Sequence, residues 1–146
     1  MPKDNPTILR GDTSWRAPAM GRYKFNCDVA MPSSNRASTV AAVLRDADGK
    51  ILEGVTSSFQ VASSLVGELA AIREACVMVN SLKLSGCEVE SDSRMAILLS
   101  ASELVPPWEA SALVWDIKQL SARRQIQFCW VRRTANRVGS PSGLFS

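Results

Sequence analysis

The 146-residue sequence contains no histidine, and this absence removes several kinds of catalytic chemistry at once. Ser-His and Cys-His nucleophilic mechanisms need an imidazole base, and many zinc motifs need histidine ligands. Any chemistry must therefore rest on carboxylates, lysines or hydroxyls. C-x-x-C pairs are also absent, so we expect the four cysteines, which lie in apolar stretches, to be buried reduced thiols: Cys27, Cys76, Cys87 and Cys129.

Long apolar runs and a strong net charge are missing as well. No window approaches the ~20 apolar residues needed to cross a bilayer, and the first twenty residues hold Asp4 and Asp12 instead of a signal-peptide core. A formal charge of +3 is too small to indicate a polyanionic partner by itself. We therefore expect a soluble, intracellular protein with no membrane partner, whose apolar residues, 46% of the chain, build one core.

The most informative stretch runs from Tyr23 to Ala30, YKFNCDVA, where apolar and polar positions mostly alternate. Alternation with a period of two is typical of a β-strand. Asp28 lies within this strand, although a carboxylate among β-forming residues is disfavoured and needs a reason. Asp28 is therefore the first candidate for a functional residue.

The rest of the chain predicts further strands and helices in an α/β order. Two strands flank Asp48-Gly49, a strong hairpin signal, which makes the first three strands antiparallel. Apolar residues at alternating steps of four and three predict a long helix over residues 64–82, capped by Ser63 or Ser64. The prediction is completed by four further elements: a fourth strand at 86–91, a short helix at 93–100, a second amphipathic helix at 109–123 and a fifth strand at 126–132.

The two ends of the chain lack a long periodic pattern. Prolines and glycines are spread over the first 22 residues, which favours an extended segment. The last residues begin like a helix, but Gly139, Pro141 and Gly143 should stop it. We expect three parts: an N-terminal arm at 1–20, the domain at 21–140 and an irregular tail at 141–146.

Three acidic residues that are far apart in the sequence should meet at one edge of the sheet. Glu68 lies on the buried side of the long helix near its start, and Asp92 follows the fourth strand. A right-handed crossover makes that strand parallel to the first, so both acids approach Asp28 at the carboxyl edge. Clustered carboxylates repel one another unless their pKa values rise or a hard cation binds. Oxygen ligands favour Mg²⁺ or Mn²⁺, and two such ions can hydrolyse a phosphodiester.

Several of these residues also have simpler explanations. Asp92 could cap the following helix, and Glu68 could favour the positive end of its own helix while reaching solvent. Trp108 could stack on nucleic acid, but a tryptophan after two prolines more often packs against a helix start. Arg132 and Arg133, at the end of the fifth strand, could pair with phosphates or be ordinary surface charges.

A series of short motifs occurs in a fixed order between residues 15 and about 140. They are W-R-A-P, K-F-N-C-D-V-A, V-L-R-D-A-D-G, G-E-L-A-A-I-R-E-A, E-S-D-S, P-W and V-R-R-T-A-N. In this order and spacing they resemble the ribonuclease H fold in the form found in plant reverse-transcriptase-like domains. The resemblance implies an α/β fold with a five-stranded mixed sheet, the first three strands antiparallel, flanked by helices.

The same resemblance implies a nuclease that uses two Mg²⁺ or Mn²⁺ ions to cut the RNA strand of an RNA/DNA hybrid. Asp28 would bridge both ions, while Glu68 and Asp92 would complete one of them. Nucleic-acid contacts are expected at Arg132, Arg133 and, within the T-A-N motif, Asn136. Recognition would rest on backbone shape and 2′-hydroxyls, so sequence preference should be weak.

This chain departs from the family pattern at the position of its fourth metal ligand, which is usually a carboxylate or histidine. Counting from A-N-x-V places Ser140 there, and serine is a poor ligand for a hard divalent cation. Val29 replaces a glycine after the first aspartate, and Thr39 and Ala41 replace glycines before V-L-R-D. We therefore expect weakened hydrolysis. The alternatives are a non-catalytic nucleic-acid-binding module and an inert retroelement-derived remnant whose sheet edge serves another protein.

Overall fold

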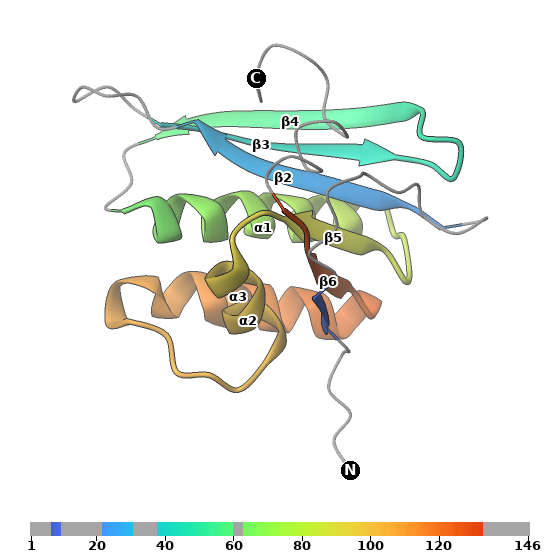
Figure 1. Cartoon of the computed structure of the whole chain (residues 1–146). Coiled ribbons are helices and arrows are strands. Elements are labelled where there is room, and N and C mark those ends of the chain that lie inside the picture. Colours follow the sequence, from blue (N-terminus) through green and yellow to red (C-terminus); the bar gives the residue numbers. More distant parts are fainter. Residues whose placement is uncertain (1–6, 10–21, 31–37, 60–62, 133–146) are drawn as a thin grey trace.

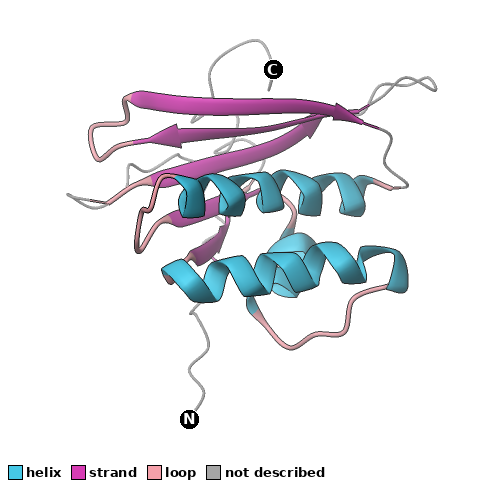
Figure 2. Ribbon diagram, turned by 180° about the vertical axis from the view of Figure 1, so that it is seen from behind, coloured by secondary structure: helices cyan, strands magenta, loops and turns pink. Residues whose placement is uncertain are grey.

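The computed structural model of this chain describes residues 7–9, 22–30, 38–59 and 63–132. In this part of the chain a six-stranded sheet has two long helices lying on one side of it (Figures 1 and 2). The strands are β1 (Thr7–Leu9), β2 (Lys24–Ala30), β3 (Ser38–Arg45), β4 (Ile51–Phe59), β5 (Glu88–Ser91) and β6 (Gln127–Trp130). The helices are α1 (Ser64–Ser81), α2 (Arg94–Ala101), the single 3₁₀ turn η1 (Trp108–Ala110) and α3 (Ser111–Arg124).

The sheet has the order β1-β6-β5-β2-β3-β4. β2, β3 and β4 pair antiparallel, while β5 is parallel to β2 and β6 is parallel to β5. This confirms the expected α/β fold and its mixed sheet. One strand was not expected: β1, within the predicted N-terminal arm, pairs parallel with β6 and makes the sheet six-stranded instead of five-stranded. A three-residue strand is too short to show alternation, which explains why the sequence pattern missed it.

The turn between β3 and β4 is formed as the Asp48-Gly49 pair predicts. Gly49 has a φ of 79°, and its N–H donates to the carbonyl of Asp46 over 2.9 Å. The Asp46 carboxylate accepts two further bonds of 2.9 Å from the backbone N–H groups of Asp48 and Lys50. An aspartate that satisfies the backbone in this way stabilises a tight turn and fixes the register of the two strands.

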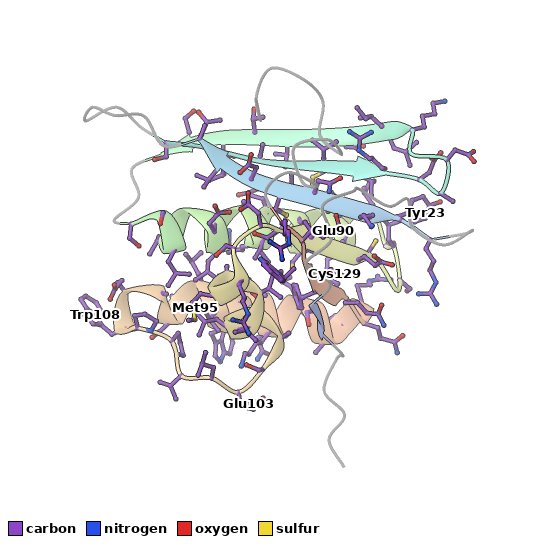
Figure 3. All side chains as sticks on the ribbon, viewed as in Figure 1. Tyr23, Glu90, Met95, Glu103, Trp108 and Cys129 are labelled. Atoms are coloured by element: carbon purple, nitrogen blue, oxygen red, sulfur yellow. The ribbon has the colours of Figure 1, made fainter. Side chains whose placement is uncertain are left out.

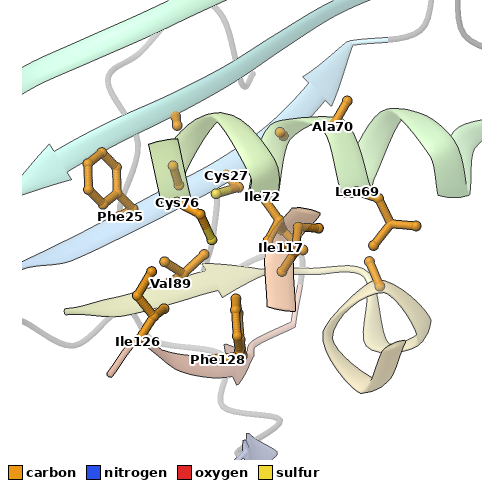
Figure 4. Close-up of a cluster of buried hydrophobic side chains, with 14 of the residues drawn as sticks. Phe25, Cys27, Leu69, Ala70, Ile72, Cys76, Val89, Ile117, Ile126 and Phe128 are labelled. Atoms are coloured by element: carbon orange, nitrogen blue, oxygen red, sulfur yellow. The ribbon is translucent and has the colours of Figure 1, made fainter. Parts of the chain in front are cut away.

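Helix α1 is capped by Ser63, the first of the two serines considered as caps. The hydroxyl of Ser63 accepts a hydrogen bond from the N–H of Val66, which satisfies one of the unpaired donors of the first turn. The apolar stripe of α1 then packs on the sheet (Figure 4), and α3 lies beside α1 (Figures 1 and 2). The central members of this core are Phe25, Cys27, Leu69, Ile72, Cys76, Val89, Ile117, Ile126 and Phe128.

All four cysteines are free and buried, as expected. No helix in the described residues is both long and apolar enough to cross a membrane. The predicted C-terminal helix and tail, and most of the N-terminal arm, fall outside the described residues. The three-part division of the chain therefore stays a prediction.

Candidate metal centre

Asp28 lies in β2 on the sheet face opposite the apolar core. Phe25 and Cys27 point into the core beneath α1, so the alternation of a strand turns Asn26 and Asp28 to the other face. Asp28 is nevertheless only 5% exposed, and its Oδ1 accepts a hydrogen bond of 2.8 Å from the N–H of Val29. This bond orients the carboxylate within the sheet.

Val29, which stands where the family expects glycine, is accommodated in regular strand. It pairs with Val40 of β3, and it is not among the described residues with a positive φ. Its side chain packs against the core, so the departure from the family pattern introduces no backbone strain here.

Asp92 follows β5 directly and is held in place by its neighbours. The indole Nε1 of Trp130 donates to the carbonyl of Asp92 over 3.3 Å, and the N–H of Ser93 donates to Oγ of Ser91 over 3.1 Å. The helix cap is Ser93, whose hydroxyl accepts from the N–H of Ala96. The alternative that Asp92 caps α2 is therefore wrong.

Glu68 lies in the second turn of α1 and is buried, with 6% of its surface exposed. The alternative that this side chain reaches solvent is therefore wrong.

The three carboxylates converge as the topology predicts. Asp28, Glu68 and Asp92 each offer one oxygen, and these oxygens all lie within 4.8 Å of one another. Oxygens bound to a single Mg²⁺ at its usual bond length lie about 3 to 4 Å apart, so small side-chain movements would close this group around one ion. The donor set consists of carboxylate oxygens only, which fits a hard divalent cation.

The thiol of Cys27, next to Asp28 in β2, does not offset the charge of the carboxylates. Burial raises the pKa of the Cys27 thiol well above its usual value, and Cys76, Glu68 and Asp28 add to the effect. A thiol under these conditions stays protonated and neutral. It neither relieves the repulsion among the carboxylates nor competes with them for a hard cation.

The predicted nucleic-acid contacts are only partly described. Arg132 is exposed just beyond β6, the strand next to the one that leads to Asp92. Arg133, Asn136 and Ser140 lie outside the described residues. Trp108 is 86% exposed in η1, away from the sheet (Figure 3), so the interpretation that it packs against a helix start is wrong.

The structure also buries three polar residues beside the acidic cluster that the sequence analysis did not single out. Lys24, Asn26 and Glu90 are all fully buried. The available signal was spacing: K-x-N-x-D and E-x-D place these residues on the same strand faces as Asp28 and Asp92. Without the structure, that spacing describes an ordinary solvent-facing strand equally well.

Solved structures with the same architecture identify the class of fold. The N-terminal RNase H domain of a Mycobacterium tuberculosis protein matches with a TM-score of 0.69 and 19% identity, covering 79% of this chain and 90% of that one. RNase H1 of Halobacterium salinarum NRC-1 matches with a TM-score of 0.68 and 18% identity, covering 80% and 89%. LC11-RNase H1, solved in complex with an RNA/DNA hybrid, matches with a TM-score of 0.67 and 16% identity, covering 78% and 88%.

These likenesses define a domain with the ribonuclease H fold. Residues 26–140 also match the family model described as reverse transcriptase-like, and this chain belongs to that family. The resemblance drawn from the sequence motifs is thereby confirmed. A comparison with curated proteins found no match.

Proposed function

We propose that the protein is a divalent-metal-dependent ribonuclease that binds an RNA/DNA hybrid and hydrolyses its RNA strand. The observation that carries this proposal is the group of carboxylates formed by Asp28, Glu68 and Asp92, whose oxygens lie within 4.8 Å of one another; Asp28 and Glu68 are buried and Asp92 is partly buried. Three clustered acids, two of them buried, are costly for a fold, so a function that needs them is the better explanation.

Each acid has a defined part in this mechanism. Asp28, oriented by the N–H of Val29, is the central ligand and would be shared between two ions. Glu68, from α1, and Asp92, from the end of β5, would complete the coordination of one of these ions. Mg²⁺ or Mn²⁺ held by these residues would supply an activated water and would stabilise the leaving oxygen of the phosphodiester. Burial of Asp28 and Glu68 would limit the access of bulk water and strengthen their hold on the ions.

The proposed substrate follows from the family and from the chemistry that surrounds the site. LC11-RNase H1, which has the same fold, was solved in complex with an RNA/DNA hybrid. Arg132, with Arg133 and Asn136, would contact phosphates near the cluster. Such contacts predict salt-dependent binding with little sequence preference.

Ser140 favours a second candidate function, a module that binds the hybrid without cutting it. A serine at the fourth-ligand position leaves one ion with fewer protein oxygens. Both candidates require hybrid binding, so cleavage separates them. We propose weak hydrolysis as the first expectation because the three principal carboxylates are retained.

The test is incubation of the purified protein with a labelled RNA/DNA hybrid and Mg²⁺ or Mn²⁺. Asp28→Asn should lower cleavage at least about a hundredfold, because a lost metal ligand removes several kcal/mol of transition-state stabilisation. Asp116→Asn is the matched control, because Asp116 is half-exposed on α3 and pairs with Arg73.

Three outcomes of this experiment contradict the proposal in different ways. Cleavage that survives Asp28→Asn would show that the acidic cluster is not the active site. Salt-sensitive hybrid binding without cleavage would favour the binding module. No hybrid binding at all would favour the inert remnant.

A further inference from the structure

Lys24, Asn26 and Glu90 form a continuous buried network between β2 and β5. In the parallel register of these strands, Lys24 lies opposite Glu88 and Asn26 lies opposite Glu90. Alternation places all four side chains on the sheet face that also carries Asp28. Glu90 lies near the centre of the molecule (Figure 3).

Both carboxylate oxygens of Glu90 are engaged by side chains from β2. Lys24 Nζ lies 2.7 Å from Oε2, and Asn26 Nδ2 donates a hydrogen bond of 3.0 Å to Oε1. Lys24 also lies 3.6 Å from Oε1 of Glu88. Glu90 is therefore clamped from two directions by the neighbouring strand.

The clamp is located where β2 and β5 stop pairing. Asn26–Glu90 is the last backbone pair of the two strands; beyond it, Asp28 pairs with Ala41 of β3. Ser91 of β5 meanwhile pairs with β6. We call this point the fork. Beyond the fork, β2 and the chain that follows β5 form two separate branches. Asp28 lies two residues past Asn26 on the first branch, and Asp92 lies two residues past Glu90 on the second, a distance of about 7 Å along each chain.

Stability alone does not account for these residues. A buried ion pair costs so much desolvation that apolar residues of similar size often replace it without loss of stability. The Lys24–Glu90 pair is buried on both sides, and it lies next to a cluster that already carries an excess of negative charge. A role in geometry explains this placement better.

We infer that Asn26, Glu90 and Lys24 are positioning residues that hold the fork and thereby set the separation of the Asp28 and Asp92 carboxylates. Asn26 and Glu90 join the two branches, and Lys24 fixes the orientation of Glu90. The effect of these residues on metal binding rests on the proposed function. The structural link that they make between β2 and β5 at the fork does not. We propose no direct contact of Lys24, Asn26 or Glu90 with the metal or the substrate.

The first test is Asn26→Leu, which keeps the size of the side chain and removes the donor to Glu90. Mn²⁺ affinity measured by titration calorimetry should fall about tenfold, because lost support of metal ligands typically costs 10- to 100-fold. In the metal-free protein, the amides of Val29 and Asp92 should exchange faster with deuterium.

The matched control is Asn80→Leu. Asn80 also bridges two elements, since its Nδ2 bonds to the carbonyls of Cys76 and Leu120. This variant should lose stability but keep parental Mn²⁺ affinity. Equal losses of affinity in both variants would overturn the inference, because they would trace the effect to general stability.

The second test compares Lys24→Met with the double variant Lys24→Met/Glu90→Met. The single variant leaves a buried carboxylate without its cation and should be destabilised, while the double variant should recover most of that stability. Because the double variant also lacks the acceptor for Asn26, its Mn²⁺ affinity should stay about tenfold low. If the double variant recovers parental Mn²⁺ affinity together with its stability, the role of these residues is purely structural and the inference is overturned.

Failure of the proposed function gives a different result from failure of this inference. A parental protein that binds no Mn²⁺ contradicts the metal site, while faster exchange at Val29 and Asp92 in Asn26→Leu still supports the link at the fork. Unchanged exchange at these amides overturns the link whether or not the parent binds Mn²⁺.

Discussion

The indole nitrogen of Trp130, on β6, donates a hydrogen bond of 3.3 Å to the backbone carbonyl of Asp92, just beyond β5. Val131 adds a second tie, since its N–H donates to the carbonyl of Ser91 over 3.1 Å. Strand β6, which lies between β1 and β5 in the parallel part of the sheet, thus holds the turn that carries one of the three clustered acids. The bond from Trp130 is made to the backbone of Asp92.

Trp130→Phe should keep the aromatic packing and lose the bond to Asp92. We expect a loss of about 1 kcal/mol in the free energy of unfolding, the usual worth of one such bond, and Mn²⁺ affinity should fall a few-fold. Urea denaturation and titration calorimetry measure the two effects. Trp115→Phe is the control, because Trp115 is exposed on α3 and should change neither quantity. Unaltered affinity in Trp130→Phe would contradict the positioning of Asp92 by β6.

Glu68→Gln should stabilise the metal-free protein while abolishing metal binding. The substitution removes one of three clustered like charges, which should raise the free energy of unfolding by about 1 kcal/mol. Calorimetric scans in EDTA would show a higher Tm, and added Mn²⁺ should raise the Tm of the parent but not of the variant. Glu74→Gln, on a partly exposed face of the same helix, should match the parent. A lower Tm in EDTA would show that the three carboxylates do not repel one another.

Cys87 should make stability depend on alkaline pH. Burial raises the pKa of its thiol to about 12, whereas an unfolded thiol ionises near pH 9. Above pH 9 the unfolded state therefore binds fewer protons than the folded state, and stability falls as pH rises. The advantage of the parent over Cys87→Ala in free energy of unfolding should shrink by about 1 kcal/mol between pH 8.5 and 10.

Urea titrations at the two pH values measure this change. Val79→Ala, a truncation at another fully buried position, is the control and should cost the same at both. A constant difference between the parent and Cys87→Ala would show that this thiol ionises as readily in the folded protein as in the unfolded chain.

Ser140→Asp should strengthen hydrolysis if the serine stands at the fourth-ligand position of the family. An added carboxylate would give the second ion a hard oxygen ligand, so we expect at least about a tenfold faster Mg²⁺-dependent cleavage of the hybrid. Ser140→Ala should behave like the parent. An aspartate variant no faster than the alanine variant would remove the explanation offered for weak activity.

The fold could be predicted because its signals are local and strong. Three local signals each specify one element: the alternation around Asp28, the Asp48-Gly49 turn and the helical spacing after Ser63. A right-handed crossover then makes β5 parallel to β2. The convergence of the three acids follows from that topology. Strand β1 could not be predicted, because its three residues acquire their conformation from pairing with β6.

The network at the fork was missed for a different reason. Lys24 and Asn26 alternate with core residues, and an alternating polar position normally faces water. Burial of that face depends on the tertiary structure and not on the local pattern. The same limit applies to Trp108, whose 86% exposure no local rule predicts.

The central claim is that Asp28, Glu68 and Asp92 together hold a divalent cation. Crystals grown with Mn²⁺ and measured near the manganese absorption edge test it directly, because anomalous scattering locates the ion. We predict a peak among the three carboxylates, with oxygens of all three residues at ~2.2 Å from the ion. A protein saturated with Mn²⁺ whose anomalous peaks all lie elsewhere, or whose carboxylates point away from a common centre, would contradict the account.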